Sequence, residues 1–384
     1  MGSQIRFPST IRLLGLTLGL AAMVSGCGES KSSSQAISPG ASEPTLATAK
    51  ATEVKFDPQI LRDFVDNVVV PSNNQFAQRA DALSKAIAAF TKAPDDQTLK
   101  NAQNAWVAAR APWEQTECFG FGPASSLGYD GALDTWPINE TDLKALLKSS
   151  DKLTASSVEN LKETEKGFHV MEYLLFGTDK NRQAKDLTPR ELELLPLLGA
   201  NFAENANNLA NAWSKGVEGN PAYRTVMTTA GTSGNTAYPT VQAGASQIIE
   251  GMLGSLGEVA DEKIGKALEK KDSKLAESRF SFNTLTDIKH NVMGSQNAYL
   301  GTFAEAKTTG LGISSYVALI NPTLDKKIKQ QFEAALMALD KIPEPFEKSI
   351  SDPKAAASIK AAQEAVNALQ NTIDKDVKPL LKSV

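Results

Sequence analysis

The chain has 384 residues, with 40 Lys and Arg against 44 Asp and Glu, a formal net charge of −4 and a pI of about 5.5. No basic block interrupts this mildly acidic balance, which excludes the usual electrostatic footprint of a nucleic-acid-binding protein. The sequence also lacks a glycine-rich phosphate loop after a strand, a Gly-x-Ser-x-Gly elbow and a Cys-x-x-Cys pair, so several large enzyme classes are excluded.

The first 26 residues have the pattern of an export signal. Arg6 and Arg12 precede the apolar run 13–24, which is long enough for a signal-peptide core but too short for a membrane-spanning helix. The run ends in Val-Ser-Gly-Cys, which resembles the bacterial lipobox, so we expect cleavage before Cys27 and lipidation of that cysteine. An ordinary secretory signal with an incidental cysteine is the alternative. Either reading predicts an exported protein of the bacterial cell envelope, and the first predicts a membrane-anchored lipoprotein that faces the periplasm.

Residues 27–54 are rich in Ser, Ala, Gly, Pro and Lys and almost free of large apolar side chains. Such a segment buries too little surface to offset the entropy lost on ordering, so we expect a flexible tether. The only other cysteine is Cys118, so lipidation of Cys27 would leave no intramolecular disulfide.

From Phe56 onward the pattern is helical. Apolar residues recur every three or four positions, as in 76–90 and 359–381, and alternating strand-like runs are scarce. The polar segment 219–239 contains Gly, Asn, Pro, Ser and Thr and is the best candidate for a domain boundary. We therefore predict an all-α protein of two packed helical bundles, 55–218 and 240–384, joined by a linker at 219–239.

Residues 109–123 form the first of three unusual clusters. Glu114 and Glu117 have i, i+3 spacing, and the Phe, Gly and Pro residues that follow end the helix in a shaped loop. The cluster could bring carboxylates to a cleft. The alternative is structural, with Arg110 and Glu114 as an i, i+4 ion pair and Glu117 in solvent.

The second cluster, 167–177, contains one of only two histidines in the chain. His169 and Glu172 are three residues apart, so a helix would place an imidazole nitrogen and a carboxylate on one face. The surrounding side chains are apolar, and buried polar groups need partners. The pair is either half of a metal site or a hydrogen-bonded pair that closes the core, and Gly167 indicates that another segment approaches closely there.

The third cluster, 277–301, is unusually polar for a helix, with Asp287 and Asn291 at i, i+4 spacing. So many polar groups at helical spacing indicate hydrogen bonding to a ligand or within an inter-helix network.

The three segments ARAPWEQTECFGFGP, GFHVMEYLLFG and SRFSFNTLTDIKHNVMGSQNAYLG together resemble the signatures of the imelysin-like family over about residues 55–380. This family includes iron-regulated envelope proteins of bacteria and is also classed as peptidase family M75. The resemblance implies two related helical bundles that meet at a groove. The groove residues it implies are Arg110, Glu117, His169, Glu172, Arg279, Ser281, Asn283, Asp287 and Asn291.

A catalytic zinc site normally has three protein ligands, yet the chain has neither His-Glu-x-x-His nor His-x-x-Glu-His, and His290 would complete a set only by tertiary contact. An oxygen and nitrogen set suits iron or another divalent ion. We expect iron or a similar metal, or an iron-bearing ligand, to bind in the groove and to serve iron acquisition with an envelope transport partner. The expected metal ligands are His169, Glu172, Glu117 and Asp287, and no catalytic residue is assigned. The alternatives are an imelysin-type metallopeptidase and a non-catalytic module that binds a partner protein.

Overall fold

The computed structural model describes residues 54–382, and their structure is almost entirely helical. The expected all-α fold is confirmed; the exceptions are two antiparallel strands of two residues each, β1 (Thr302–Phe303) and β2 (Thr308–Thr309). The predicted signal peptide, the tether up to residue 53 and Cys27 lie outside the described residues. Within the described part, no helix is long and apolar enough to cross a bilayer.

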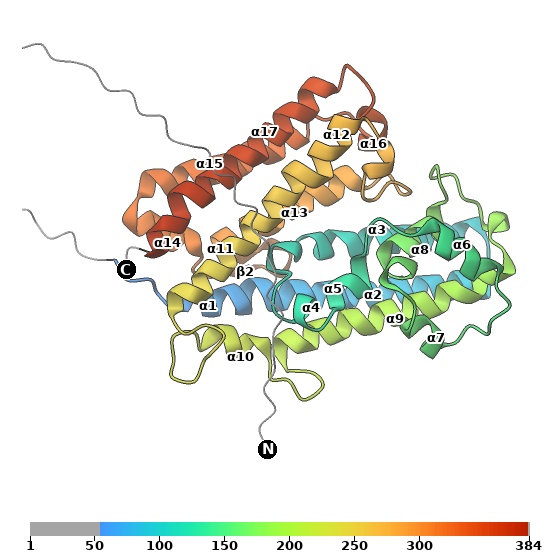
Figure 1. Cartoon of the computed structure of the whole chain (residues 1–384), viewed down its shortest axis with the longest axis horizontal. Coiled ribbons are helices and arrows are strands. Elements are labelled where there is room, and N and C mark those ends of the chain that lie inside the picture. The colour runs from blue at the N-terminus through green and yellow to red at the C-terminus, as the bar shows by residue number, and fades with distance from the viewer. Residues whose placement is uncertain (1–53, 383–384) are drawn as a thin grey trace, which may run out of the picture. The chain divides into compact units, whose positions relative to one another are not determined.

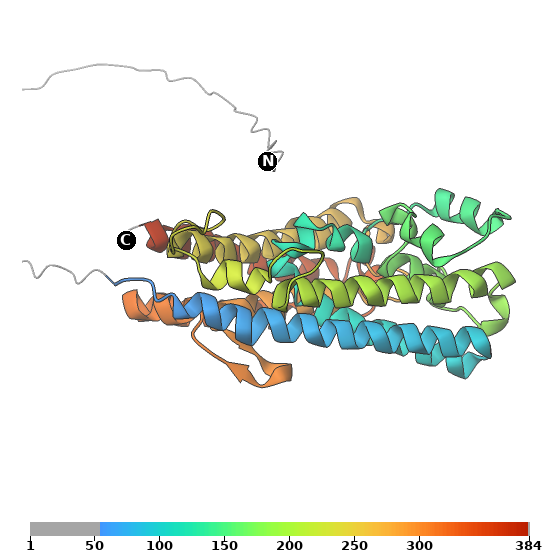
Figure 2. The same ribbon diagram turned by 90° about the horizontal axis from the view of Figure 1, so that it is seen from below.

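The N-terminal half of the described chain is built on three long helices. The buried residues of α2 include Phe76, Ala80, Leu83, Ile87 and Phe90, which recur every three or four positions, so one stripe of this helix faces the core. Helix α2 packs against both α3 and α9, and Figure 2 shows α2 and α9 side by side. The helices of this half are α1 (Gln59–Asp63), α2 (Val70–Lys92), α3 (Asp96–Glu114), α4 (Pro123–Ser126), α5 (Tyr129–Asp134), α6 (Glu140–Lys148), α7 (Ala155–Glu159), α8 (Phe168–Phe176) and α9 (Pro189–Ser214).

The C-terminal half is a second group of helices, in which α11 and α13 pack together and α15 packs against α17. Helix α11 continues directly into a π-helical segment, Glu258–Lys266. The helices of this half are α11 (Val241–Gly257), α12 (Ala267–Lys270), α13 (Thr284–Leu300), α14 (Ile313–Ile320), α15 (Pro322–Leu339), α16 (Phe346–Ser349) and α17 (Ala356–Thr372), and a further π-helical turn lies at Ile373–Val377. Helix α10 (Tyr223–Thr228) lies in the segment between the two halves, and another π-helical turn, Phe64–Val69, joins α1 to α2.

The two halves contact each other through α13 and the end of α3, and Figure 1 shows α13 beside α3. Gly294 makes this close contact possible, because a Cβ atom there would lie 2.4 Å from the carbonyl oxygen of Gln115. This contact places the third sequence cluster, 277–301, against the first, 109–123.

The described residues, 54–382, form one compact unit. The predicted linker 219–239 contains α10 and packs on the N-terminal half, where the ring of Tyr223 lies 5.0 Å from that of Trp213. The division into two separate bundles stays a prediction.

Candidate metal centre

The three sequence clusters meet in one buried network of charged side chains. The end of α3 supplies Arg110 and Glu114, α8 supplies His169 and Glu172, and the segment before α13 supplies Glu277. All five side chains are at most 5% exposed. Their ionised groups lie away from water, so each one needs a partner of opposite charge.

Gly167 sets the position of α8. Its φ of +81° is in the left-handed region, and a Cβ atom there would lie 2.6 Å from the carbonyl oxygen of Leu133. The segment whose close approach the sequence indicated is therefore the end of α5. Because Asp134 follows Leu133, this contact brings the Asp134 carboxylate beside His169.

Phe168 anchors the same turn in the apolar core. Its carbonyl oxygen accepts a 3.0 Å hydrogen bond from Nε1 of Trp106, and its ring packs on Phe202 at 4.4 Å between centroids. These contacts hold the backbone next to His169 in place, and so they help to fix the position of its imidazole.

The two nitrogens of His169 have different surroundings. Nδ1 lies 2.9 Å from Oε2 of Glu172, and because a carboxylate can only accept, Nδ1 carries the hydrogen and donates it. Nε2 lies 3.0 Å from Oδ1 of Asp134 and 4.0 Å from Oε1 of Glu277, yet it is buried and makes no hydrogen bond of good geometry. A histidine held through Nδ1 by a carboxylate presents Nε2 to a metal, as in many metal sites.

Glu172 is fully occupied by hydrogen bonds. Its Oε1 accepts from the backbone N–H groups of Phe280 at 3.0 Å and Ser281 at 2.7 Å, and from the Ser281 hydroxyl at 2.7 Å. Its Oε2 accepts from His169. Glu172 therefore orients the histidine and fastens the segment before α13 to α8, which leaves it little freedom to bind a metal itself.

Arg110 is fully buried and binds acidic side chains from several elements. Its guanidinium donates to both oxygens of Asp134 at 2.8 Å and contacts Glu277 at 3.2 Å and Asp287 at 3.4 Å. It also pairs with Glu114 one turn further along α3. Arg110 thereby neutralises part of the acidic cluster and holds it together.

Lys263, on the π-helical segment, is the second buried cation and is 1% exposed. Its ammonium lies 2.8 Å from Glu277, 3.2 Å from Glu114 and 3.3 Å from Glu117. It also donates a 3.0 Å hydrogen bond to Oδ1 of Asn291. Carboxylates from both halves of the protein thus share one cation.

The network holds more negative than permanent positive charge. Two permanent cations, Arg110 and Lys263, face six carboxylates. These are Glu114, Glu117, Asp134, Glu172, Glu277 and Asp287. Protons or a bound cation must supply the difference, because uncompensated buried charge is costly.

The pKa values reflect this imbalance. Burial lowers the pKa of His169, but the negative charge of Asp134 and the hydrogen-bonding interactions with Asp134 and Glu172 together outweigh burial and raise that pKa to about 9. Burial raises the pKa of Glu117 to about 8 although Lys263 opposes it, and burial raises the pKa of Asp287 to about 6 although Arg110 opposes it. Without a metal, protons therefore provide part of the missing positive charge near neutral pH.

Two sets of side chains in the described part of the chain are placed to hold a metal ion. The first is Asp134, His169 and Glu277, and the second is Glu114, Glu117, Asp134 and Glu277; within each set the candidate ligand atoms lie within 4.8 Å of one another. The first set fits a divalent ion such as iron because it combines an imidazole nitrogen that lacks a hydrogen bond with two carboxylates. His290 belongs to neither set.

The structure brings most of the sequence-predicted residues into this network. Asp287 accepts hydrogen bonds from Asn283 at 2.7 Å and from Ser278. Asn291 donates a hydrogen bond to Glu117 at 3.0 Å. Arg279 lies at the periphery, where it pairs with Glu140 of α6 at 2.6 Å. Of the four predicted metal ligands, His169 and Glu117 belong to these sets. Glu172 and Asp287 belong to neither set and instead contact other members of the network, His169 and Arg110 respectively.

Sequence reasoning missed Asp134, Glu277 and Lys263. Lys263 carried a signal, because it follows Val259 and Ala260 at helical spacing and so occupies a core position. Asp134 has no comparable local pattern, since only the contact at Gly167 brings it to His169.

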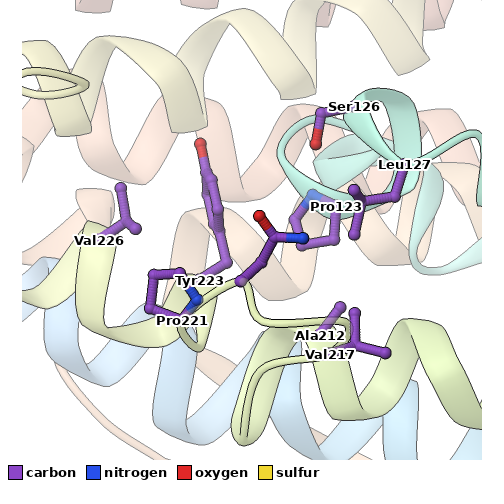
Figure 3. A pocket seen from close by; sticks show the side chains of 9 residues that line it. Pro123, Ser126, Leu127, Ala212, Val217, Pro221, Tyr223 and Val226 are labelled. Atoms are coloured by element: carbon purple, nitrogen blue, oxygen red, sulfur yellow. The ribbon is translucent and has the colours of Figure 1, made fainter. Parts of the chain in front are cut away.

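A separate apolar hollow lies between α4, the end of α9 and α10 (Figure 3). Its volume is about 190 Å³. The lining residues are Pro123, Ser126, Leu127, Ala212, Val217, Asn220, Pro221, Tyr223 and Val226. None of them is a carboxylate, a histidine or a cysteine, so this hollow is not the metal centre.

The fold and the network define an all-α protein with a buried histidine–carboxylate centre between its two halves. The chain belongs to the imelysin family, whose model, named for peptidase M75, matches residues 69–373. It is 37% identical over 331 residues to iron-regulated protein A of Synechococcus elongatus, covering 86% of this chain and 88% of that protein.

Two solved structures share the fold. One is described as an iron-regulated protein A precursor from Parabacteroides distasonis, with a TM-score of 0.75 and 26% identity over 84% of this chain and 94% of that one. The other is an imelysin-like protein from Psychrobacter arcticum, with a TM-score of 0.67 and 12% identity over 86% of this chain and 98% of that one. The second likeness concerns the fold alone.

Proposed function

We propose that this protein binds iron, or another divalent ion, at His169, Asp134 and Glu277, and serves iron acquisition in the bacterial cell envelope. The observation that carries the proposal is the buried Nε2 of His169, which lies between two carboxylates while Nδ1 is held by Glu172. The excess of buried carboxylates supports it, and so does the similarity to a protein named for its regulation by iron.

A route for the ion from solvent begins at Glu117, whose side chain is 17% exposed and lines a small hollow together with Asp130 and Gly120. The exposed Asp130 lies one helical turn before Asp134 on α5. Acidic side chains at an entrance raise the local concentration of cations.

Deep burial favours binding over hydrolysis of a polypeptide. The side chains of His169, Asp134 and Glu277 are at most 5% exposed, so a peptide bond could not reach them without a large rearrangement. A protease would need an open ligand position that substrate can enter.

The test is metal binding by the chain from residue 27 onward carrying Cys27→Ser, measured by calorimetry with Mn²⁺ as an air-stable substitute for ferrous iron. We expect binding by this parent and loss of binding in His169→Ala, with helical circular dichroism unchanged. His290→Ala is the matched control, because it removes the other histidine of the chain. Binding that survives His169→Ala would refute the proposed site, and an absence of binding by the folded parent would refute the function.

The lipid anchor is a separate part of the proposal. Lipidation of Cys27 would hold the folded unit close to the membrane where imported iron arrives. Replacing Cys27 by Ser should release the protein from the membrane fraction, and mass spectrometry should detect the acyl chains on the wild-type cysteine. An unmodified Cys27 in the mature protein would contradict the anchor.

A further inference from the structure

The ammonium of Lys263 lies among side chains that could themselves hold a metal ion. Its three carboxylate partners, Glu114, Glu117 and Glu277, belong to the second set of candidate metal ligands. The amide oxygen of Asn291 is a fourth acceptor, at 3.0 Å. Three carboxylates and an amide oxygen around one point are a donor set that also suits a hard divalent cation.

Glu277 links this position to the first set. Its Oε1 faces His169 Nε2 at 4.0 Å and Arg110 at 3.2 Å, whereas its Oε2 faces Lys263 at 2.8 Å. One carboxylate thus lies between two cation positions, as bridging carboxylates do in two-metal sites. The difference here is that a side chain of the protein itself provides the second cation.

Lys263 is held in place by the helix that carries it. Val259, Ala260 and Ile264 of the same π-helical segment are buried beside it, and α17 packs against this segment. The side chain is 1% exposed, so the ammonium could reach solvent only if this packing were lost. Its charge is therefore a permanent part of the site.

We propose that Lys263 fills the second cation position and thereby limits the centre to a single divalent ion per chain. This inference rests on the proposed metal-binding function and adds the stoichiometry and its determinant. Removing the charge while keeping a hydrogen-bond donor should leave three carboxylates and Asn291 facing an empty position, and a second divalent ion should then bind there.

The experiment compares Lys263→Gln, Lys263→Arg and Lys266→Gln in the chain from residue 27 carrying Cys27→Ser. Each protein is equilibrated with Mn²⁺, and the bound metal per chain is measured after gel filtration. We expect one ion in the parent and two in Lys263→Gln. Lys263→Arg keeps the charge and should bind one. Lys266 is half exposed on the same segment and pairs with Glu262, outside the buried network, so Lys266→Gln should also bind one.

A double variant shows where the second ion lies. Adding Glu117→Gln to Lys263→Gln removes a carboxylate of the second set only, so the stoichiometry should return to one. Because Lys263→Gln concentrates negative charge, thermal unfolding is followed with and without Mn²⁺. The metal should raise the unfolding temperature of this variant more than that of the parent.

The failures of the two proposals are distinguishable. Suppose that the parent binds one ion. If Lys263→Gln then also binds one ion, or does not recover its fold in Mn²⁺, the proposed role of Lys263 is overturned and the metal site remains. A folded parent that binds no ion would overturn the proposed function.

Discussion

Replacing Glu172 by Gln should disturb the hydrogen bond that orients His169 while keeping the other hydrogen bonds of residue 172. Gln keeps one oxygen to accept the hydrogen bonds from Phe280 and Ser281, but it presents an NH₂ group to Nδ1 of His169. Two donors would then face each other. The neutral imidazole relieves this conflict by moving its hydrogen to Nε2, which is the nitrogen that we propose as a metal ligand.

The expected loss is moderate for both binding and stability. Losing the partner that orients a metal-binding histidine lowers affinity roughly 10–100-fold, which corresponds to about 1.4–2.8 kcal/mol. The free energy of unfolding should fall by about 1.5–3 kcal/mol, since one hydrogen bond to a charged group is lost. Three of the four hydrogen bonds to residue 172 survive, so the variant should remain folded.

Calorimetric titration with Mn²⁺ and urea unfolding measure the two effects. Glu191→Gln is the matched control, because Glu191 is a 6% exposed glutamate that accepts a 2.7 Å hydrogen bond from the N–H of Thr188 at the start of α9, outside the network. It should lose stability without losing affinity. Equal Mn²⁺ affinity in Glu172→Gln and the parent, or an equal loss in Glu191→Gln, would refute the orienting role.

The pKa values of the two histidines are shifted in opposite directions, and each shift should make a different property of the protein depend on pH. Because Asp134 raises the pKa of His169 to about 9, a proton competes with the metal below that pH, and affinity for Mn²⁺ should rise with pH by up to about tenfold per unit between pH 6 and 8.5; a flat profile would contradict this. Burial instead lowers the pKa of His290 to about 4, so the unfolded chain binds a proton that the folded chain excludes, and stability should fall by about 1.4 kcal/mol per unit as pH drops from 6.5 towards 4. Urea unfolding at pH 7 and 5 should show a smaller drop in His290→Gln than in the parent, and an equal drop would refute the assignment.

The sequence predicts the helices and part of the site for separate physical reasons. The apolar spacing along α2 depends on neighbours within one helix, so it is visible in the chain itself. The pairing of His169 with Glu172 is equally local, and the structure has it at 2.9 Å. Asp134 and Glu277 instead reach His169 through contacts between distant segments, and no spacing along the chain encodes those contacts.

Lys263 shows a different limit of sequence reasoning. Its neighbours Glu258, Asp261, Glu262 and Lys266 give the segment the composition of a solvated helix face. The buried residues around it follow a helical stripe, and a lysine on such a stripe is an anomaly that requires buried counter-charges. Those counter-charges come from α3 and the segment before α13, and their presence is known only from the fold.

Gly167→Ala tests whether the contact between α5 and α8 builds the metal centre. The new Cβ atom would lie 2.6 Å from the carbonyl oxygen of Leu133, and a φ of +81° strains any residue with a side chain. Relief requires the end of α5 to move away, and Asp134 would move with it from His169 and Arg110. We expect a loss of about 1–3 kcal/mol in the free energy of unfolding and weaker binding of Mn²⁺.

The matched control for this change is Gly254→Ala, because Gly254 is an exposed residue of α11 with no atom within 4 Å of an added Cβ. Alanine favours the helix there by up to about 1 kcal/mol, so the control should be as stable as the parent or more stable. Urea unfolding and Mn²⁺ titration of both variants separate the two effects. If Gly167→Ala matched Gly254→Ala in both measurements, the position of Asp134 would not depend on the glycine, and close approach at residue 167 would not explain how the carboxylate reaches His169.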